Sequence, residues 1–127
     1  PYCFDDVVKI AIQQVKDFNS YEHSESKYVF FDTDLIITKV WFEEVYKSIP
    51  VWLADEIKKC KPYLSILCYT DVEWKYDPLR ENSGERRNKL YLRYKNELED
   101  FSHPYKILTG RGLQRFRNVI QLMETIS

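Results

Sequence analysis

The sequence predicts an α/β fold in which three short parallel strands alternate with helices. Three apolar runs of strand length, rich in β-branched and aromatic residues, lie at residues 28–31, 63–70 and 105–109. Stretches with apolar residues at helical spacing separate these runs. Such alternation is typical of a parallel sheet covered by helices. About three strands make a small sheet for this class, so we expect the sheet to be incomplete.

Length, charge and cysteine content narrow the class of protein. The chain has 127 residues, which suits one domain with its own core. Its net charge of −1, with acids and bases interspersed, argues against a protein that coats nucleic acid or an anionic membrane. The three cysteines form no Cys-x-x-Cys pair, which favours a reducing, cytoplasmic compartment, and Cys68 is expected to be buried. No apolar run approaches the roughly 20 residues of a membrane span.

The first helix is expected to begin at Asp5 or Asp6, either of which can cap it. Gln13 and Gln14 fall within this helix and are expected at its surface. The helix carries apolar residues at helical spacing: Val7, Val8, Ala11, Val15 and Phe18.

The acid turn (residues 32–34, Asp-Thr-Asp) is the first candidate site. It follows residues 28–31, which are expected to form a strand buried on both faces, and precedes a helix at about 35–47. Acids at the carboxyl edge of a parallel sheet can hold Mg²⁺ or orient an attacking hydroxyl. Alternatively, Asp34 only caps the helix and Asp32 lies in a solvated turn. The sequence pattern leaves both interpretations open.

A short helix after Pro50, with Trp52, Leu53 and Ile57 facing inward, is expected to end before Pro62. The second strand, residues 63–70, follows. Strand, two helices and strand in this order predict a right-handed crossover between parallel neighbours.

Residues 71–84 have no helical or strand period and form the second candidate site. Asn82 and Glu85 have the spacing of a capping box, which predicts a long helix through about Asp100. Arg86 and Arg87 lie at its start, where cations oppose the helix dipole. An anionic ligand such as phosphate would compensate for them, and so would local pairing with glutamates. Both alternatives stay open.

The third strand, residues 105–109, leads into the glycine turn (residues 110–112, Gly-Arg-Gly). Glycines permit backbone angles that other residues avoid, so a tight turn is expected there. The last helix, residues 113–126, is expected to bury one apolar face, made of Leu113, Phe116, Val119, Ile120 and Met123.

Four segments together resemble the nicotinamide riboside kinase domain of the NadR type, in the AAA-like P-loop kinase group. They are PYCFDDVVKIAIQQ, YVFFDTDLIITKVWFEEVY, WKYDPLREN with the arginine-bearing helix after it, and PYKILTGRG. The resemblance covers nearly the whole chain and implies a three-layer, mostly parallel sheet of a P-loop NTPase-like kinase.

The chain departs from this family in one important respect. It contains no phosphate-binding loop of the type G-x-x-x-x-G-K-[ST]. We therefore expect residues 1–127 to be the C-terminal portion of a single P-loop kinase-like domain, with a lid-like segment at about 71–95. On its own this portion is expected to be inactive, and to self-associate through its uncovered strand edge and apolar face.

The resemblance implies catalytic roles for the two acids. Asp32 would serve Mg²⁺, through water, or act as the base toward the riboside hydroxyl. Asp34 would bind the ribose or support Asp32. In the lid, Trp74 would stack on the nicotinamide ring and Asp77 would also contact the substrate.

The resemblance also implies a nucleotide-binding set. Arg80, Arg86 and Arg87 would close over the phosphates of ATP. Gly110 and Arg111 of the glycine turn would touch the adenine.

The function implied is transfer of the γ-phosphate of ATP, with Mg²⁺, to nicotinamide riboside, giving nicotinamide mononucleotide for NAD biosynthesis. Two alternatives remain: a ligand-sensing module of an NAD-responsive transcriptional regulator, and a kinase for another nucleoside. Direct nucleic-acid binding by this segment is not expected, because its charge is balanced and no basic helix stands out.

Overall fold

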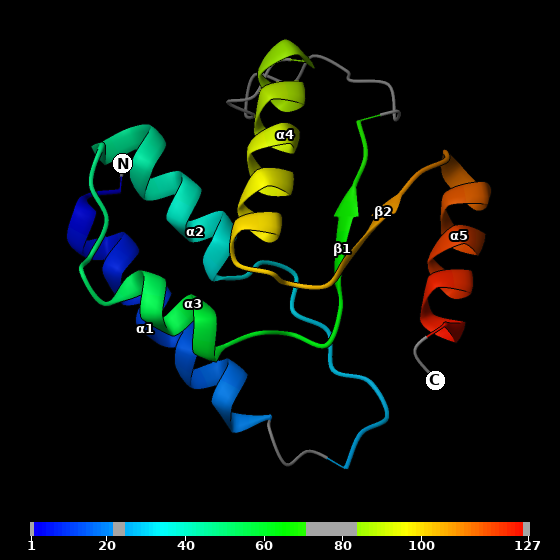
Figure 1. The fold of residues 1–127 in the computed structure, drawn as a ribbon, viewed down its shortest axis with the longest axis horizontal. Helices are drawn as coiled ribbons and strands as arrows, with labels where there is room; N and C mark the ends of the chain where they lie inside the picture. Colours follow the sequence, from blue (N-terminus) through cyan, green and yellow to red (C-terminus); the bar gives the residue numbers. More distant parts are fainter. Residues whose placement is uncertain (1, 22–24, 71–83, 126–127) are drawn as a thin grey trace. The chain divides into compact units, whose positions relative to one another are not determined.

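The computed structural model describes residues 2–21, 25–70 and 84–125. The chain forms two compact units, Pro1–Lys61 and Pro62–Ser127, which are described separately below. The first holds helices and the second a small α/β arrangement (Figure 1). Within the described ranges, no helix has both the length and the apolar character needed to cross a bilayer.

In the described part of the first unit, every regular element is a helix. Helix α1 spans Phe4–Ser20, α2 spans Leu35–Trp41, and α3 spans Leu53–Lys59. Between α2 and α3, η1 (Phe42–Tyr46) continues α2 as a π-helical turn and ends at Lys47, whose φ is 56°. The predicted helix at 35–47 is thus confirmed, with its last part wound more loosely than an α-helix.

The core of the first unit forms where α1, α2 and α3 turn their apolar faces toward one another. Helical spacing in the sequence placed four of its members at apolar positions: Val7, Ala11, Leu53 and Ile57. Phe42 is the largest side chain that is fully buried, and its ring centroid lies 5.0 Å from that of Phe4. The other buried apolar residues among those described are Val7, Ala11, Leu35, Ile36, Val40, Leu53, Ile57 and Cys60.

The predicted capping of α1 by Asp5 or Asp6 from outside the helix is wrong in detail. The helix begins at Phe4, with Cys3 as its N-cap and both acids within the first turn. Asp6 still stabilises the helix start, because its Oδ2 accepts a hydrogen bond of 3.0 Å from the backbone N–H of Cys3. This hydrogen bond lowers the pKa of the Asp6 carboxyl from its usual value.

The strand predicted at residues 28–31 is absent from the structure. The segment is irregular, and Phe30 is 67% exposed while Phe31 is 38% exposed. A strand is completed only by hydrogen bonds to a neighbouring strand. The described part of the first unit contains no other strand, so its backbone has no such neighbour within the unit. The composition of these residues predicted a strand, but pairing decides whether one forms.

The second unit is built on a parallel pair of strands. Strand β1 spans Ser65–Cys68 and β2 spans Tyr105–Leu108, with Ser65 opposite Tyr105 in the register. Both fall within runs that predict strands. The described sheet has two strands rather than three, and the three-layer arrangement remains a prediction.

Helix α4 (Gly84–Asp100) connects the two strands and packs on β1, while α5 (Gly112–Glu124) follows β2 and packs on it (Figure 1). The crossover predicted between residues 28–31 and 63–70 is not formed, because residues 28–31 are not a strand. The parallel connection that the described residues show joins β1 to β2, the second and third predicted strands. Asn82, the cap expected for α4, lies outside the described residues. Among the described residues of this unit, the buried side chains are Leu67, Leu98, His103 and Leu108.

Two burial predictions for the second unit are wrong. Cys68 is exposed at the end of β1. The apolar face of α5 is also largely uncovered: Leu113 is 64% exposed, Phe116 61% and Ile120 41%. The physical reason is the width of the described sheet, since two strands offer less surface than the apolar face of a helix of this length needs. Helical spacing predicted that these residues share one face of a helix. The structure confirms this, because all of them lie within α5.

Candidate functional site

The acid turn in the first unit places one carboxylate in solvent and uses the other to start a helix. Asp34 is the N-cap of α2, and its Oδ1 accepts hydrogen bonds of 3.1 Å from Ile36 N and 3.3 Å from Ile37 N. Asp32 is exposed, and no hydrogen bond or ion pair joins its carboxylate to another described residue. The interpretation of Asp34 as a helix cap is therefore correct, and Asp32 is the acid presented to solvent.

Replacing Asp34 by alanine is expected to lower the free energy of unfolding by about 1 kcal/mol, because two helix-start amides lose their acceptor. Urea unfolding of the 127-residue chain measures the change. Asp32→Ala is the matched control and should stay within about 0.5 kcal/mol, since its side chain is exposed. Equal losses in the two variants would contradict the capping role of Asp34.

Gln14 of α1 braces the acid turn, and the sequence pattern placed this residue at the surface. Its Nε2 lies 3.4 Å from Thr33 Oγ1 and 3.5 Å from the carbonyl oxygen of Asp34. Its Oε1 accepts a hydrogen bond of 2.7 Å from the hydroxyl of Thr38, which is only 3% exposed. The sequence did hold a signal: Gln14 follows Val7 and Ala11 at the spacing of the buried helix face.

In the second unit, the Arg87 side chain and the glycine turn lie at the carboxyl edge of the sheet. Arg87, in the first turns of α4, lies with Nη2 3.5 Å from the carbonyl oxygen of Thr70, just beyond β1. Arg86 is its exposed neighbour on the same helix. Gly110 and Arg111 lie just beyond β2, and Arg111 is the N-cap of α5. The structure thus brings Arg87 and the glycine turn to the same edge of the sheet.

Arg115 of α5 is the residue at this edge that sequence reasoning missed. Its Nε donates to the carbonyl oxygen of Gly110 at 2.8 Å, and its Nη2 donates to that of Tyr69 at 3.0 Å. A guanidinium group has five donors in a fixed fork, which suits several carbonyl groups at strand ends. Arg115 therefore ties the ends of β1 and β2 to α5. Its position one helical turn after Arg111 was the available signal.

The glycine turn needs glycine most at its first position. Gly110 has φ of +96°, and a Cβ there would lie 3.0 Å from Asn118 Nδ2 and 3.2 Å from Arg115 N. Gly112 has φ of +54°, and a Cβ there would meet nothing within 4 Å. Both glycines thus occupy the left-handed region, as the sequence predicted, but only Gly110 also lies against other atoms.

Gly110→Ala is expected to lower the free energy of unfolding by about 2–3 kcal/mol, through backbone strain and overlap with α5. Gly112→Ala is the matched control and should cost about 1–2 kcal/mol, from backbone strain alone. Urea unfolding of the two variants measures the difference. A smaller loss for Gly110→Ala than for Gly112→Ala would contradict the close approach at Gly110.

The candidate residues fall into three groups. Asp32 and Asp34 belong to the first unit, and the predicted nucleotide-binding residues Arg86, Arg87, Gly110 and Arg111 belong to the second. Trp74, Asp77 and Arg80 lie outside the described residues.

Mg²⁺ was expected at Asp32, and the chemistry of the acid turn is compatible with it. Mg²⁺ usually keeps several waters and takes one or two protein carboxylates, with substrate phosphates as further ligands. An exposed carboxylate with no hydrogen-bond or ion-pair partner among the described residues fits that role. Across residues 2–21, 25–70 and 84–125, no group of three or more His, Cys, Asp or Glu side chains is arranged to hold a metal ion. A site built from protein ligands alone is thus absent from these ranges.

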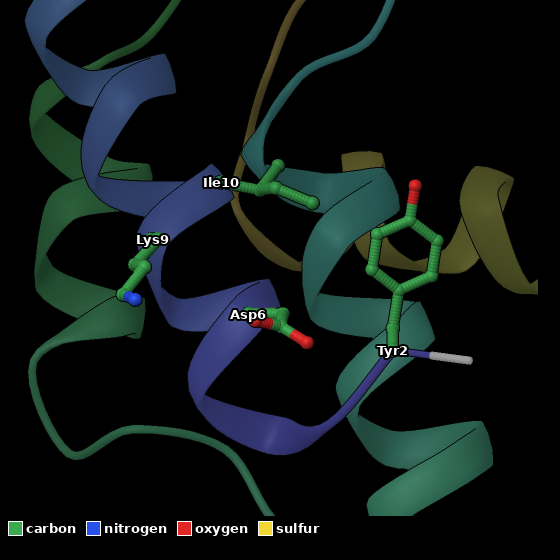
Figure 2. Close-up of a pocket in the computed structure, with 4 residues that line it drawn as sticks. All are labelled: Tyr2, Asp6, Lys9 and Ile10. Carbon is green, nitrogen blue, oxygen red and sulfur yellow. The ribbon is translucent and has the colours of Figure 1, made fainter.

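An open hollow of about 630 Å³ lies beside α1 and is lined by Tyr2, Asp6, Lys9 and Ile10 (Figure 2). Three of these residues belong to α1, and Tyr2 precedes the helix. The Tyr2 ring lies 5.2 Å from that of Trp41, edge to face. The Asp6 carboxylate already accepts the Cys3 amide, as described above. We therefore assign this hollow no binding role.

Comparison with known proteins gives one family. A family model described as an AAA domain matches residues 2–115. No curated protein and no solved structure matches the chain significantly.

Proposed function

This chain belongs to the AAA domain family, a family of P-loop NTPase-like domains, and from that premise we propose that its parent protein is an ATP-dependent nucleoside kinase. The acceptor we propose is nicotinamide riboside, which would become nicotinamide mononucleotide. The observation that carries the proposal is the Asp32 carboxylate, exposed in a turn that two helices hold in place. Domains of this family generally bind ATP with Mg²⁺.

In this proposal Asp32 is the catalytic carboxylate of the acid turn. Mg²⁺, when bound with ATP, neutralises charge on the phosphates, and Asp32 would hold it through water. Alternatively, Asp32 accepts the proton of the riboside hydroxyl, as a base within hydrogen-bond reach of that group. Asp34 supports Asp32, because its carboxylate fixes the start of α2 immediately after the turn.

The acceptor is proposed from the sequence of the lid-like segment. Trp74 has a large flat ring suited to stacking on nicotinamide, and Asp77 follows it in the W-x-x-D-P-L-R pattern. Arg80, Arg86 and Arg87 are proposed to close over the phosphates, and Gly110 and Arg111 to contact the adenine. The position of Arg87 at the carboxyl edge of the sheet supports its part in this set, because ligands of α/β sheets bind along that edge.

In this proposal the phosphate-binding loop comes from sequence other than these 127 residues. Its backbone amides and its lysine hold the β- and γ-phosphates in P-loop enzymes, and no G-x-x-x-x-G-K-[ST] motif occurs here. We place it, in this proposal, upstream of Pro1 in the parent protein. The 127-residue chain alone is therefore expected to show no ATP-dependent turnover.

The test is ADP production by the parent protein with ATP, Mg²⁺ and a panel of ribosides. The expected result is turnover that depends on nicotinamide riboside, and none from the 127-residue chain under the same conditions. Turnover with a different riboside would keep the kinase and replace the acceptor. No turnover with any riboside would overturn the kinase proposal, and turnover by the 127-residue chain would overturn the proposed missing loop.

A further inference from the structure

We propose that Gln14 is a positioning residue for the acid turn, so that the direction of Asp32 depends on helix α1. This inference rests on the proposed function insofar as Asp32 is its catalytic carboxylate. Gln14 itself would touch neither the nucleotide nor the acceptor. It would act through the backbone of residues 32–34.

The orientation of the Gln14 amide follows from its neighbours. The carbonyl oxygen of Asp34 can only accept a hydrogen bond, so the group 3.5 Å from it must be the amide nitrogen. The amide oxygen then faces the hydroxyl of Thr38, which donates to it at 2.7 Å. The same nitrogen lies 3.4 Å from Thr33 Oγ1. One side chain of α1 thus connects two residues of the acid turn with the first turn of α2.

The partly buried location of Gln14 indicates that its side chain is needed for these hydrogen bonds. It is partly buried on the face of α1 that carries the buried residues Val7 and Ala11, and its partner Thr38 is buried on α2. A polar amide at such a position is destabilising unless it is hydrogen-bonded, and an aliphatic side chain would pack there more simply. The adjacent Gln13 differs, because it is exposed and donates at 2.8 Å to Asp17 of its own helix.

Hydrogen bonds from α1 and from α2 therefore hold Thr33 and Asp34 of the acid turn in place. The Asp34 carboxylate is fixed by the amides of α2, while its carbonyl oxygen and the Thr33 hydroxyl face Gln14. Asp32 comes next and is exposed, without a side-chain partner among the described residues. Its direction is consequently set by the backbone of the turn. Loosening Gln14 should displace the Asp32 carboxylate without changing its charge.

The experiment compares four forms of the parent protein: wild type, Gln14→Leu, Gln14→Glu and the matched control Gln13→Leu. Gln14→Leu removes both hydrogen-bonding groups, whereas Gln14→Glu keeps the acceptor for Thr38 and loses the donor to the turn. Both Gln14 variants should lower kcat by about 10- to 100-fold, because a small misplacement of a catalytic group has effects of this size. KM for ATP should stay within about twofold, because Gln14 does not contact ATP and the substitutions leave the binding of ATP in the ground state unchanged. Gln13→Leu should match the wild type.

A second measurement does not depend on activity. Amide hydrogen exchange at Ile36 and Ile37, whose N–H groups donate to Asp34, should become faster in both Gln14 variants than in Gln13→Leu. A merely structural role would weaken folding and speed exchange throughout the unit, rather than at the start of α2. Thr38→Ser, which keeps the hydroxyl, should behave as the wild type, and Thr38→Val as Gln14→Leu.

Each outcome decides the inference. If both Gln14 variants equal Gln13→Leu in kcat and in exchange, the positioning role is wrong. If Gln14→Leu does not fold, Gln14→Glu and Thr38→Val carry the same comparison. If the wild type has no turnover with any riboside, the proposed kinase fails and exchange alone decides: faster exchange confined to Ile36 and Ile37 supports Gln14 as the residue that orders the turn, and unchanged exchange overturns it.

Discussion

Asp32→Asn in the parent protein is expected to lower riboside-dependent ADP production by about 100- to 1,000-fold, the size typical of removing a base or a charge at a reacting centre. Asparagine keeps the shape of the side chain and removes its negative charge. Because Asp32 is exposed and its carboxylate forms no hydrogen bond or ion pair with a described residue, stability should change by less than about 0.5 kcal/mol. Steady-state kinetics and urea unfolding of the same preparation measure both quantities.

Asp55→Asn is the matched control for this experiment. Asp55 is an exposed acid of the same unit, in the first turn of α3, and removing it changes the net charge equally. Its turnover should equal that of the wild type. Unchanged turnover in Asp32→Asn would overturn the catalytic role of this acid. A loss of stability large enough to unfold the protein under the assay conditions would instead indicate that the substitution lowers activity through folding.

Phe42→Ala is expected to lower the free energy of unfolding of the 127-residue chain by about 3–5 kcal/mol, from lost burial and the cavity left behind. Phe42 is 0% exposed, and its ring centroid lies 5.0 Å from that of Phe4 and 6.3 Å from that of Tyr46. Such a loss is a large share of the roughly 5–15 kcal/mol that stabilises a typical domain. Urea unfolding with the midpoint and the slope recorded measures it.

Phe30→Ala is the matched control, because the same residue type is removed from the same unit at a position 67% exposed. It should cost less than about 1 kcal/mol. This pair of variants also distinguishes the buried strand predicted at residues 28–31 from the exposed segment that the structure shows. A buried strand at residues 28–31 would make both substitutions equally costly, and that result would contradict the exposed position of Phe30.

Local periodicity was sufficient for the elements whose partners lie next to them in the chain. The helical stripe of α1, the helix after the acid turn and the runs that form β1 and β2 were all predicted, and the structure confirms them. The backbone hydrogen bonds of a helix form within the helix itself, so the spacing of its own apolar residues is enough to predict it. For β1 and β2 the crossover through α4 supplied the pairing that composition alone cannot.

The parts of the candidate site that local sequence motifs determine were also predicted. The acid turn and the glycine turn were recognised from short motifs, and the capping role of Asp34 was one of the two interpretations that the sequence left open. Gln14 and Arg115 were missed because each acts on backbone groups distant in sequence: Gln14 on the acid turn, Arg115 on the ends of β1 and β2. A side chain's partner across a fold is invisible to periodicity.

What the sequence by itself determined is the set of helices, the strands β1 and β2, and the residue types at the two turns, because spacing and turn chemistry are local properties. Tertiary structure alone decided which of the apolar runs pairs and which apolar faces are covered. Residues 28–31 and the face of α5 have the composition of buried segments, yet Phe30 and Phe116 are exposed. Burial is a property of two surfaces in contact, and a sequence describes only one of them at a time.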